Sequence, residues 1–531
     1  MSMIRVLQAF RGMTRVGVVA MLTVACPARL SAQEPSAPVI DSIIVETTNV
    51  FDPAMAETNV LFRIANALHF TTRPSVVRSE LLLKQGDRWD GALLEESLRN
   101  LRARGLFRDV QADTIRAGDR LHLILRTYDG WSTQLVLNAG SVAGEVTWAI
   151  GGQERNVLGL GARLGVVYKH EVDRNSMTFR AGHDRIGGTR AGFDVSYEDL
   201  SDGNIGTWGF GVPFRALSDR HGVYFTGEAG RQRTLRFRNS AQLAEFQRRV
   251  LSQRVDVAVA PMAGANGYLR VGMTGEIRRE DYRALADSAL AIPDTVRGAV
   301  GLFGEWMSAR FKVVTHYNGF ARERDLDLST KITLIGWAAP SGFGYERSGI
   351  GPSLTVVTGF DAGPVFGWVL AHANGLFTAA GLDSGQVKGA VTVAIRGIPR
   401  APTVLHLQAA ARRGQAPGQE YDLGHGIGPR GFASHAFTGN RTVWGSIEQR
   451  VFPIDEVIGL FGVGFAAFLD YGGAWYSDQA VRLGGNVGFG LRIGATRSAG
   501  PSVGRFDVVY RFGEGLTGRP WAMSFGRGFA F

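Results

Sequence analysis

The chain has 531 residues, of which 71 are glycine and one is cysteine; 20% are charged, and the formal net charge is +10. This length exceeds an ordinary single domain, the balance of apolar and charged residues excludes a disordered chain, and one cysteine excludes a disulfide framework or a cysteine-ligated zinc site. Because the arginines are scattered, often one in each predicted strand, the positive charge does not predict a nucleic-acid partner.

The first 32 residues are typical of a secretory signal peptide. Three arginines precede a short apolar run over 16–25, and small residues follow up to Ala32. The run is about half of the roughly 20 residues that a helix needs to cross a bilayer. We therefore expect residues 1–32 to be removed on export, and no later stretch predicts a helical membrane anchor.

Residues 39–128 predict a small α+β domain in the order β-α-α-β-β. The expected elements are a strand at 40–45, helices at 74–86 and 90–105, and strands at 107–114 and 121–127. Pro74 at a first helical turn and Gly86 and Gly105 just beyond the helix ends mark the boundaries. Glu95-Glu96 is expected on a solvated helix surface, and the pattern assigns no element to 49–72.

The run GDRWDGALLEESLRNLRARGLFRDV, from Gly86 to Val110, resembles a POTRA (polypeptide-transport-associated) domain. In that family a Gly-Asp ends the first helix, and a leucine-rich second helix leads through Gly-Leu-Phe to the next strand. The resemblance implies a periplasmic domain that receives unfolded polypeptides, and main-chain pairing at a sheet edge would tolerate many client sequences. A periplasmic domain without a partner is the alternative.

Residues 131–531 show short alternating runs and no helical period, which predicts a transmembrane antiparallel β-barrel. In the last run the apolar residues share one parity: Trp521, Met523, Phe525, Phe529 and Phe531. One face can meet lipid while the other lines a lumen. The run ends at Phe531 and resembles the C-terminal signal of bacterial outer-membrane barrels. We expect it to form one side of a weak seam with the first strand. About 25 residues for a strand and its connection would give about 16 strands, an even number as bacterial barrels favour.

The tripeptide Arg430-Gly431-Phe432 precedes two predicted strands that each carry a carboxylate. Glu448 lies on the parity opposite the lipid-facing residues of its strand, and so does Asp470 on the next strand. Both carboxylates are therefore expected to face the lumen. There, the planar guanidinium of an arginine on an inward-folded loop can pair with them.

These features resemble the superfamily of outer-membrane assembly and two-partner secretion barrels, in which a bacterial surface antigen barrel follows POTRA domains. In that family an Arg-Gly-Phe motif on the sixth extracellular loop docks inside the barrel, near a Phe-x-Asp-x-Gly pattern. Here Arg430 matches the loop arginine and Phe468 to Gly472 match the pattern, whereas Pro429 stands where the family usually has Val or Ile. The resemblance implies a short, single-POTRA member in the outer membrane of a Gram-negative-type bacterium, with its N-terminal domain in the periplasm.

The resemblance implies insertion or translocation of polypeptides and no enzymatic activity. The expected partners are unfolded outer-membrane or secreted polypeptides, outer-membrane lipid and periplasmic accessory proteins. No metal is expected, because the histidines are scattered, and no cofactor is implied. The absence of a Gly-x-Ser-x-Gly elbow argues against an outer-membrane lipase. The glycines at 426–431 match a dinucleotide fingerprint only in spacing, since Pro429 lies within them and no helical pattern follows. A passive or substrate-specific pore and a structural surface protein are the alternatives.

Overall fold

The computed structural model of the chain describes residues 37–529, apart from short gaps at 143, 239, 286–291, 293, 415, 417, 425–426 and 499–502. The predicted signal peptide at 1–32 and the C-terminal Phe531 lie outside the described residues. Within the described ranges, no helix is long and apolar enough to cross a membrane.

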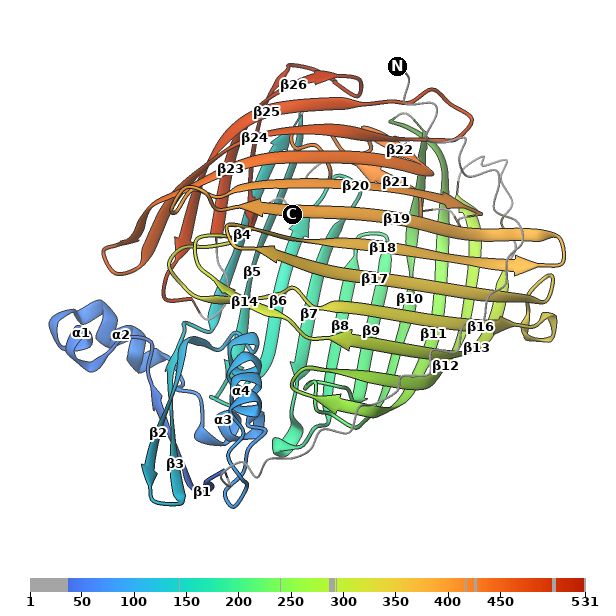
Figure 1. Ribbon diagram of the computed structural model, residues 1–531. Helices are drawn as coiled ribbons and strands as arrows, with labels where there is room; N and C mark the ends of the chain where they lie inside the picture. Colours follow the sequence, from blue (N-terminus) through green and yellow to red (C-terminus); the bar gives the residue numbers. More distant parts are fainter. Residues whose placement is uncertain are drawn as a thin grey trace.

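The N-terminal unit is a three-stranded sheet with helices packed on it (Figure 1). Its elements are β1 (Val39–Thr48), α1 (Pro53–Thr58), α2 (Val60–Leu68), α3 (Pro74–Glu80), α4 (Gly91–Ala103), β2 (Phe107–Ala117) and β3 (Arg120–Asp129). The central strand β3 runs parallel to β1 and antiparallel to β2. The order differs from the expected β-α-α-β-β because the unassigned stretch 49–72 forms two further helices, α1 and α2.

The core of this unit lies between β3 and the helices α3 and α4. Alternation along β3 turns Leu121, Leu123 and Leu125 to one face, where each is at most 5% exposed. Val77 of α3 and Leu101 of α4 cover that face and are fully buried. Each side chain of this kind contributes about 1.5–3 kcal/mol when it leaves water, so a small cluster holds the sheet and helices together.

The rest of the chain forms one closed antiparallel barrel of 20 strands in the part that the structure describes. The strands are β4 (Thr133–Val142), β5 (Glu145–Val157), β6 (Ala162–His170), β7 (Asn175–His183), β8 (Gly192–Leu200), β9 (Gly203–Val212), β10 (His221–Arg238), β11 (Ala241–Gly264), β12 (Gly267–Leu285), β13 (Thr295–Ser308), β16 (Thr330–Ala339), β17 (Gly349–Ala362), β18 (Val365–Thr378), β19 (Gly381–Ile395), β20 (Thr403–Arg413), β23 (Arg441–Val457), β24 (Phe461–Trp475), β25 (Gly484–Ala495), β26 (Val503–Gly513) and β27 (Trp521–Arg527). Single turns of 3-10 helix occur at η3 (Ile186–Gly188) and η4 (Ser341–Phe343).

The prediction of a 16-stranded barrel is therefore wrong. It allowed about 25 residues for each strand with its connection, but many hairpins turn much more tightly. The pairs β4–β5, β11–β12 and β17–β18 are each joined by only two residues. Short turns leave room for four additional strands in the same length of chain.

Alternation along the strands separates an outward apolar face from a packed interior. On β24, Phe461, Phe465 and Leu469 point outward and are 41–51% exposed. Phe468 and Asp470, on the other parity, point inward and are at most 5% exposed. The period of two places apolar side chains around the outside of the barrel and polar side chains within it.

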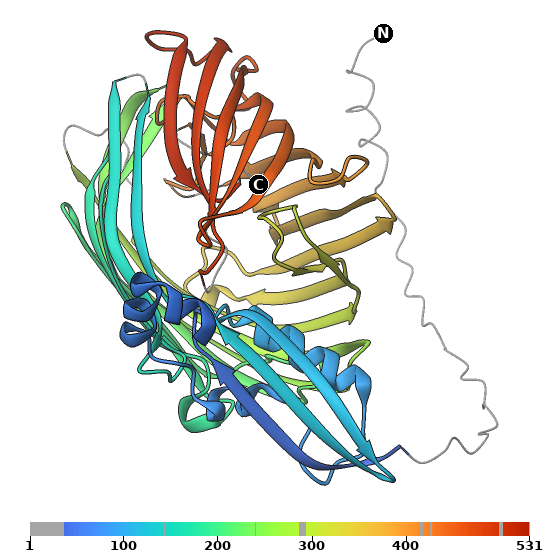
Figure 2. The same ribbon diagram turned by 90° about the vertical axis from the view of Figure 1, so that its left-hand side faces the viewer.

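Two long connections enter the barrel from opposite ends. We call residues 309–329, between β13 and β16, the inner loop, because they lie at the end next to the N-terminal unit. We call residues 414–440, between β20 and β23, the outer loop. The inner loop contains the hairpin of β14 (Phe311–Val314) and β15 (Arg324–Asp327), and the outer loop contains β21 (Tyr421–Leu423) and β22 (Phe437–Gly439). Figure 2 shows the β14–β15 hairpin inside the ring of strands.

The barrel closes between its first and last strands, β4 and β27, and this seam is short. Among the described residues, two residue pairs join the strands, Met523 with Ser141 and Ser524 with Gly140. The adjacent pairs are far longer, with seven residue pairs between β26 and β27 and ten between β4 and β5. The seam is therefore the weakest line in this region of the wall.

Candidate functional site

The outer loop places Arg430 against the inner wall of β23 and β24. Its guanidinium donates to both oxygens of Asp470, from Nε at 2.7 Å and from Nη2 at 2.8 Å, and from Nη1 to Glu448 at 2.7 Å. The aromatic ring of Phe468 lies 3.3 Å from the guanidinium carbon. All three charged side chains are at most 2% exposed, so the structure brings together the arginine and the two carboxylates that the sequence singles out.

The register of the two strands explains this geometry. Ser446 of β23 lies directly opposite Asp470 of β24, and its hydroxyl donates to Asp470 Oδ1 at 2.6 Å. Glu448 follows two residues later on the same face of β23. Asn486 of β25 completes the site, because its side-chain amide donates to the backbone oxygen of Arg430 at 2.9 Å. Three adjacent strands thus hold one loop residue.

The rest of the tripeptide fixes the loop beside the last strands. Gly431 has a φ of +81°, and a Cβ at this position would lie 2.4 Å from Cγ2 of Val509 on β26. Phe432 is fully buried and meets Phe437 edge-on at a ring separation of 5.1 Å. Only glycine combines this backbone conformation with so close an approach to the barrel wall.

Beyond the tripeptide, the outer loop reaches across the seam to the first strands. The backbone N–H of Ser434 donates to Glu145 on β5 at 2.8 Å. His435 lies between Asp422 of β21 and Asp173 of the β6–β7 connection, with its Nε2 3.1 Å from a carboxylate oxygen of Asp173. Burial lowers the pKa of His435, but the hydrogen bonds and charges of the two aspartates outweigh it and raise that pKa to about 9. The outer loop thus contacts the first strands of the barrel on one side of the seam and the last strands on the other.

A second chain of contacts runs from Glu448 to the inner loop. Arg450 Nε donates to Glu448 at 2.7 Å, while its Nη1 donates to the side-chain oxygen of Asn318 at 2.6 Å and to the backbone oxygen of Tyr317 at 3.1 Å. Glu448 therefore contacts Arg430 from the outer loop on one oxygen and Arg450 on the other. The two loops are thus linked through the buried side chains of Glu448 and Arg450.

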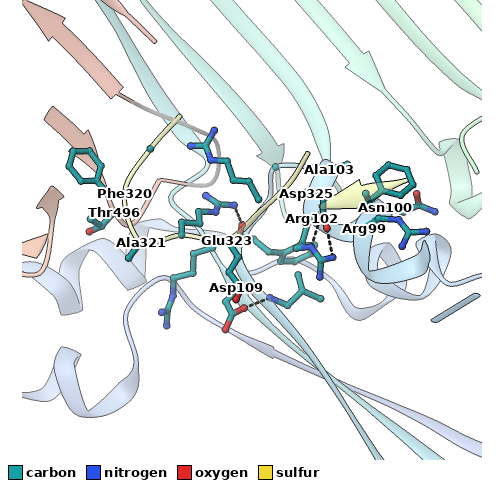
Figure 3. Close-up of a pocket in the computed structure, with 18 of the residues that line it drawn as sticks. Arg99, Asn100, Arg102, Ala103, Asp109, Phe320, Ala321, Glu323, Asp325 and Thr496 are labelled. Atoms are coloured by element: carbon teal, nitrogen blue, oxygen red, sulfur yellow. Dashed lines mark hydrogen bonds and ion pairs between the residues drawn. The ribbon is translucent and has the colours of Figure 1, made fainter. Parts of the chain in front are cut away.

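The inner loop is tied in turn to the N-terminal unit. Arg102 of α4 forms a two-point ion pair with Asp325 of β15, at 2.5 and 2.9 Å, and the Arg99 guanidinium lies 4.4 Å from the ring centre of Phe311. These contacts border a cavity of about 1150 Å³ between the N-terminal unit and the barrel interior (Figure 3). The cavity wall also includes Phe107, the first residue of β2, so an edge of the small sheet opens onto it.

A second cavity, of about 510 Å³, lies beside the seam. Asn138 and Ala139 of β4 line it on one side, Phe525 and Gly526 of β27 line it on the other, and Arg430 is part of its wall. The hydrogen-bonded part of the seam ends just before these residues. The outer loop thus borders the place where the wall is incompletely paired.

The structure separates the predicted C-terminal residues into two groups. Trp521 and Phe525 point outward and are more than half exposed. Phe529 instead turns inward, where its ring lies 4.1 Å from the guanidinium of Arg450. The reason is that β27 ends at Arg527 and Gly528 has a φ of +74°, which breaks the alternation. Phe531 lies outside the described residues.

Some residues of the site escaped the sequence argument. Arg492 on β25 donates to Asp507 on β26 at 2.6 Å, and both are at most 1% exposed. Parity places both in the lumen, but only the register of β25 with β26 brings them together. Within the described ranges, no group of three or more His, Cys, Asp or Glu side chains could hold a metal ion.

Comparisons with known proteins give a likeness at the level of whole structures only. No protein-family model matches the chain, and neither does any curated protein. The chain is similar to BamA from Haemophilus ducreyi lacking POTRA domains 1-3, with 12% identity, 93% of this chain and 85% of that chain covered, and a TM-score of 0.41. It is similar to CdiB from Acinetobacter baumannii (11% identity, 93% and 74% covered, TM-score 0.44) and to CdiB from Escherichia coli (10% identity, 96% and 93% covered, TM-score 0.47). Because all three TM-scores are below 0.5, the functional proposal rests on the contacts within this chain.

Proposed function

We propose that this protein inserts polypeptides into the bacterial outer membrane by accepting a client strand at the β4–β27 seam. The observation that carries the proposal is the incomplete pairing of that seam. Among the described residues, Thr133 to Ala139 of β4 pair with β5 and with no strand on their other side. An unpaired edge is a template for an incoming strand, and in lipid its N–H and C=O groups need partners.

Separating β4 from β27 requires less free energy than separating two strands that are paired along their whole length. Two residue pairs correspond to only a few hydrogen bonds, against the ten residue pairs that join β4 to β5. A client strand that pairs along β4 would replace these bonds and add others. The free energy of client folding is then sufficient to drive insertion, and neither a cofactor nor a nucleotide is part of the proposal.

The N-terminal unit would receive the client in the periplasm. The edge strand β2 opens onto the cavity that separates this unit from the barrel interior. Main-chain pairing at such an edge is tolerant of sequence, as a receiver of many unfolded chains requires. The strands β2, β3 and β4 follow one another in the chain. The edge that would receive the client, on β2, is therefore close in sequence to the proposed insertion edge, on β4.

A passive or substrate-specific pore is the second candidate, and the lumen disfavours it. The inner and outer loops both enter the barrel and meet through Glu448 and Arg450. This arrangement supports a closed resting state in which access depends on moving a loop.

The proposal is tested by a disulfide that locks the seam. The pair Gly140→Cys and Ser524→Cys joins facing residues of β4 and β27, in a background where Cys26 is replaced by serine. A control lock, Leu370→Cys with Ala390→Cys, joins β18 to β19 away from the seam. We expect the oxidised seam lock to abolish folding of a barrel precursor into proteoliposomes, reductant to restore it, and the control lock to leave it unchanged. Full activity of the oxidised seam lock would refute the proposal.

A further inference from the structure

The helix α2 presents an apolar face that no other described part of the chain covers. Four residues on one side of the helix and one just beyond it are 50–71% exposed: Val60, Leu61, Ile64, Leu68 and Phe70. At 100° for each residue, the four helical positions lie within one narrow sector of the helix surface. Scattered apolar residues need no explanation, but a continuous apolar face of this kind marks an interaction surface.

The opposite side of α2 is packed firmly, so the orientation of the helix is fixed. Phe62 stacks on Phe51 with ring centres 4.1 Å apart. The side-chain amide of Asn66 donates to the backbone oxygen of Phe51 at 2.8 Å, and its oxygen accepts from the backbone N–H of Phe51 at 3.0 Å. Leu460 of the β23–β24 turn and Trp131, next to β4, join this cluster. The helix therefore sits against the rim of the barrel through this cluster, and its apolar face lies on the side away from the cluster.

The outward apolar surface of the barrel reaches the turn against which α2 packs. Ile458, in the β23–β24 turn, is 74% exposed, and Val457 and Phe461 on either side of that turn are also exposed. Gly459, which follows Ile458, contacts α1 and α2, since a Cβ added there would lie 3.7 Å from Met55 and 3.7 Å from Phe62. The turn at the end of the barrel's outer apolar face thus packs against these helices. Figure 1 shows α1 and α2 set apart from α3 and α4.

We propose that α2 lies in the periplasmic leaflet of the outer membrane, with its apolar face against phospholipid acyl chains. Lipid is the occupant that we infer, because the turn that packs against α2 carries Val457, Ile458 and Phe461, exposed apolar residues at the end of the barrel's outer face. An interfacial helix buries its apolar face at the boundary of headgroups and acyl chains, with basic residues beside that face. Arg63, which is exposed, has this position on α2. The inference rests on the proposed placement of the barrel in the outer membrane.

This placement has a consequence for the seam. The cluster beneath α2 contains Trp131, which immediately precedes the unpaired edge of β4. A membrane-bound α2 would hold the N-terminal unit at the membrane surface next to that edge. A client released from β2 would then be delivered at the depth where strand addition begins.

The test is the accessibility of single spin labels in the full chain, reconstituted in vesicles of phosphatidylethanolamine and phosphatidylglycerol. With Cys26 replaced by serine, labels are placed at Ile64→Cys on α2, at Leu469→Cys on the outer face of β24, and at Ile115→Cys on β2. All three native side chains are exposed. We expect lipid-like accessibility at 64 and 469, with oxygen exceeding a water-soluble nickel chelate, and the reverse at 115.

Each other outcome is decisive. A water-like label at 64 beside a lipid-like label at 469 would overturn the inference and leave the barrel in the membrane. A label at 64 that neither reagent reaches would show a protein, such as a second copy, on that face and would also overturn it. A water-like label at 469 would refute the placement of the barrel itself, and with it the proposed function.

Discussion

Replacing Arg430 by alanine should release the outer loop from the barrel wall. The substitution removes the hydrogen bonds to Glu448 and Asp470. The buried carboxylate of Asp470 loses its arginine, whereas Glu448 keeps Arg450. Removing one member of a buried ion pair costs about 3–5 kcal/mol, because the remaining charge stays desolvated. Since 1.4 kcal/mol is a tenfold change in an equilibrium constant, the docking equilibrium should shift by about 10²-fold or more toward the released loop.

Proteolysis of the folded protein in vesicles measures this shift. A nonspecific protease added from outside should cleave within 414–440 much faster in Arg430→Ala than in the unaltered chain, while the barrel strands stay protected. Arg441→Ala is the matched control, because Arg441 is an exposed arginine at the start of β23, next to the same loop. Arg430→Lys should be intermediate, since an ammonium keeps the charge but cannot form the two-point contact with Asp470. Equal cleavage rates for Arg430→Ala and Arg441→Ala would refute the reasoning.

Three further predictions concern the loops. In Gly431→Ala, the added Cβ would lie 2.4 Å from Cγ2 of Val509 at a residue whose φ is +81°. The substitution should destabilise loop docking by at least about 1 kcal/mol and raise cleavage of the outer loop. Unchanged cleavage would contradict the close contact. Arg102→Ala breaks the ion pair between α4 and Asp325 of the inner loop. Because this loop lies in the lumen, the substitution should increase the frequency of channel openings in planar bilayers. An identical opening frequency would show that α4 does not restrain the inner loop. His435 has its folded pKa raised to about 9 from an ordinary value of about 6.5, so its contribution is complete below about pH 6.5 and is lost as the pH rises through 9. Cleavage of the outer loop should therefore be faster at pH 10 than at pH 6, and His435→Gln should remove most of that difference; an equally steep pH dependence in the variant would assign the effect elsewhere.

The alternation of residues along each strand predicted which side chains face the barrel interior. The period of two along the strands was enough to place Glu448 and Asp470 on the inner face, and the structure finds them there. Pro74 likewise located the start of α3, and the helix expected at 90–105 begins within one residue of the start of α4. These are local rules, and they work because the physical cause lies within a few residues of the effect.

Features set by distant contacts escaped the sequence argument. The expectation that Glu96 is solvated is wrong: it is 2% exposed and accepts from the backbone N–H of Leu217 at 2.5 Å, where α4 meets a turn of the barrel. The entry of the inner loop into the lumen depends on Arg450, more than a hundred residues further along the chain. The inward turn of Phe529 depends on one backbone angle, at Gly528. Neither periodicity nor composition encodes such contacts.

The most direct test of strand addition at the seam is disulfide crosslinking of a client arrested during insertion. Cysteines are placed one at a time along the unpaired edge of β4, from Thr133 to Ala139, and one at a time along the terminal strand of a barrel precursor. Strand addition predicts crosslinks in a fixed register, in which moving the β4 cysteine by two residues moves the reactive client position by two. Crosslinks without a register, or crosslinks confined to the N-terminal unit, would contradict the central claim.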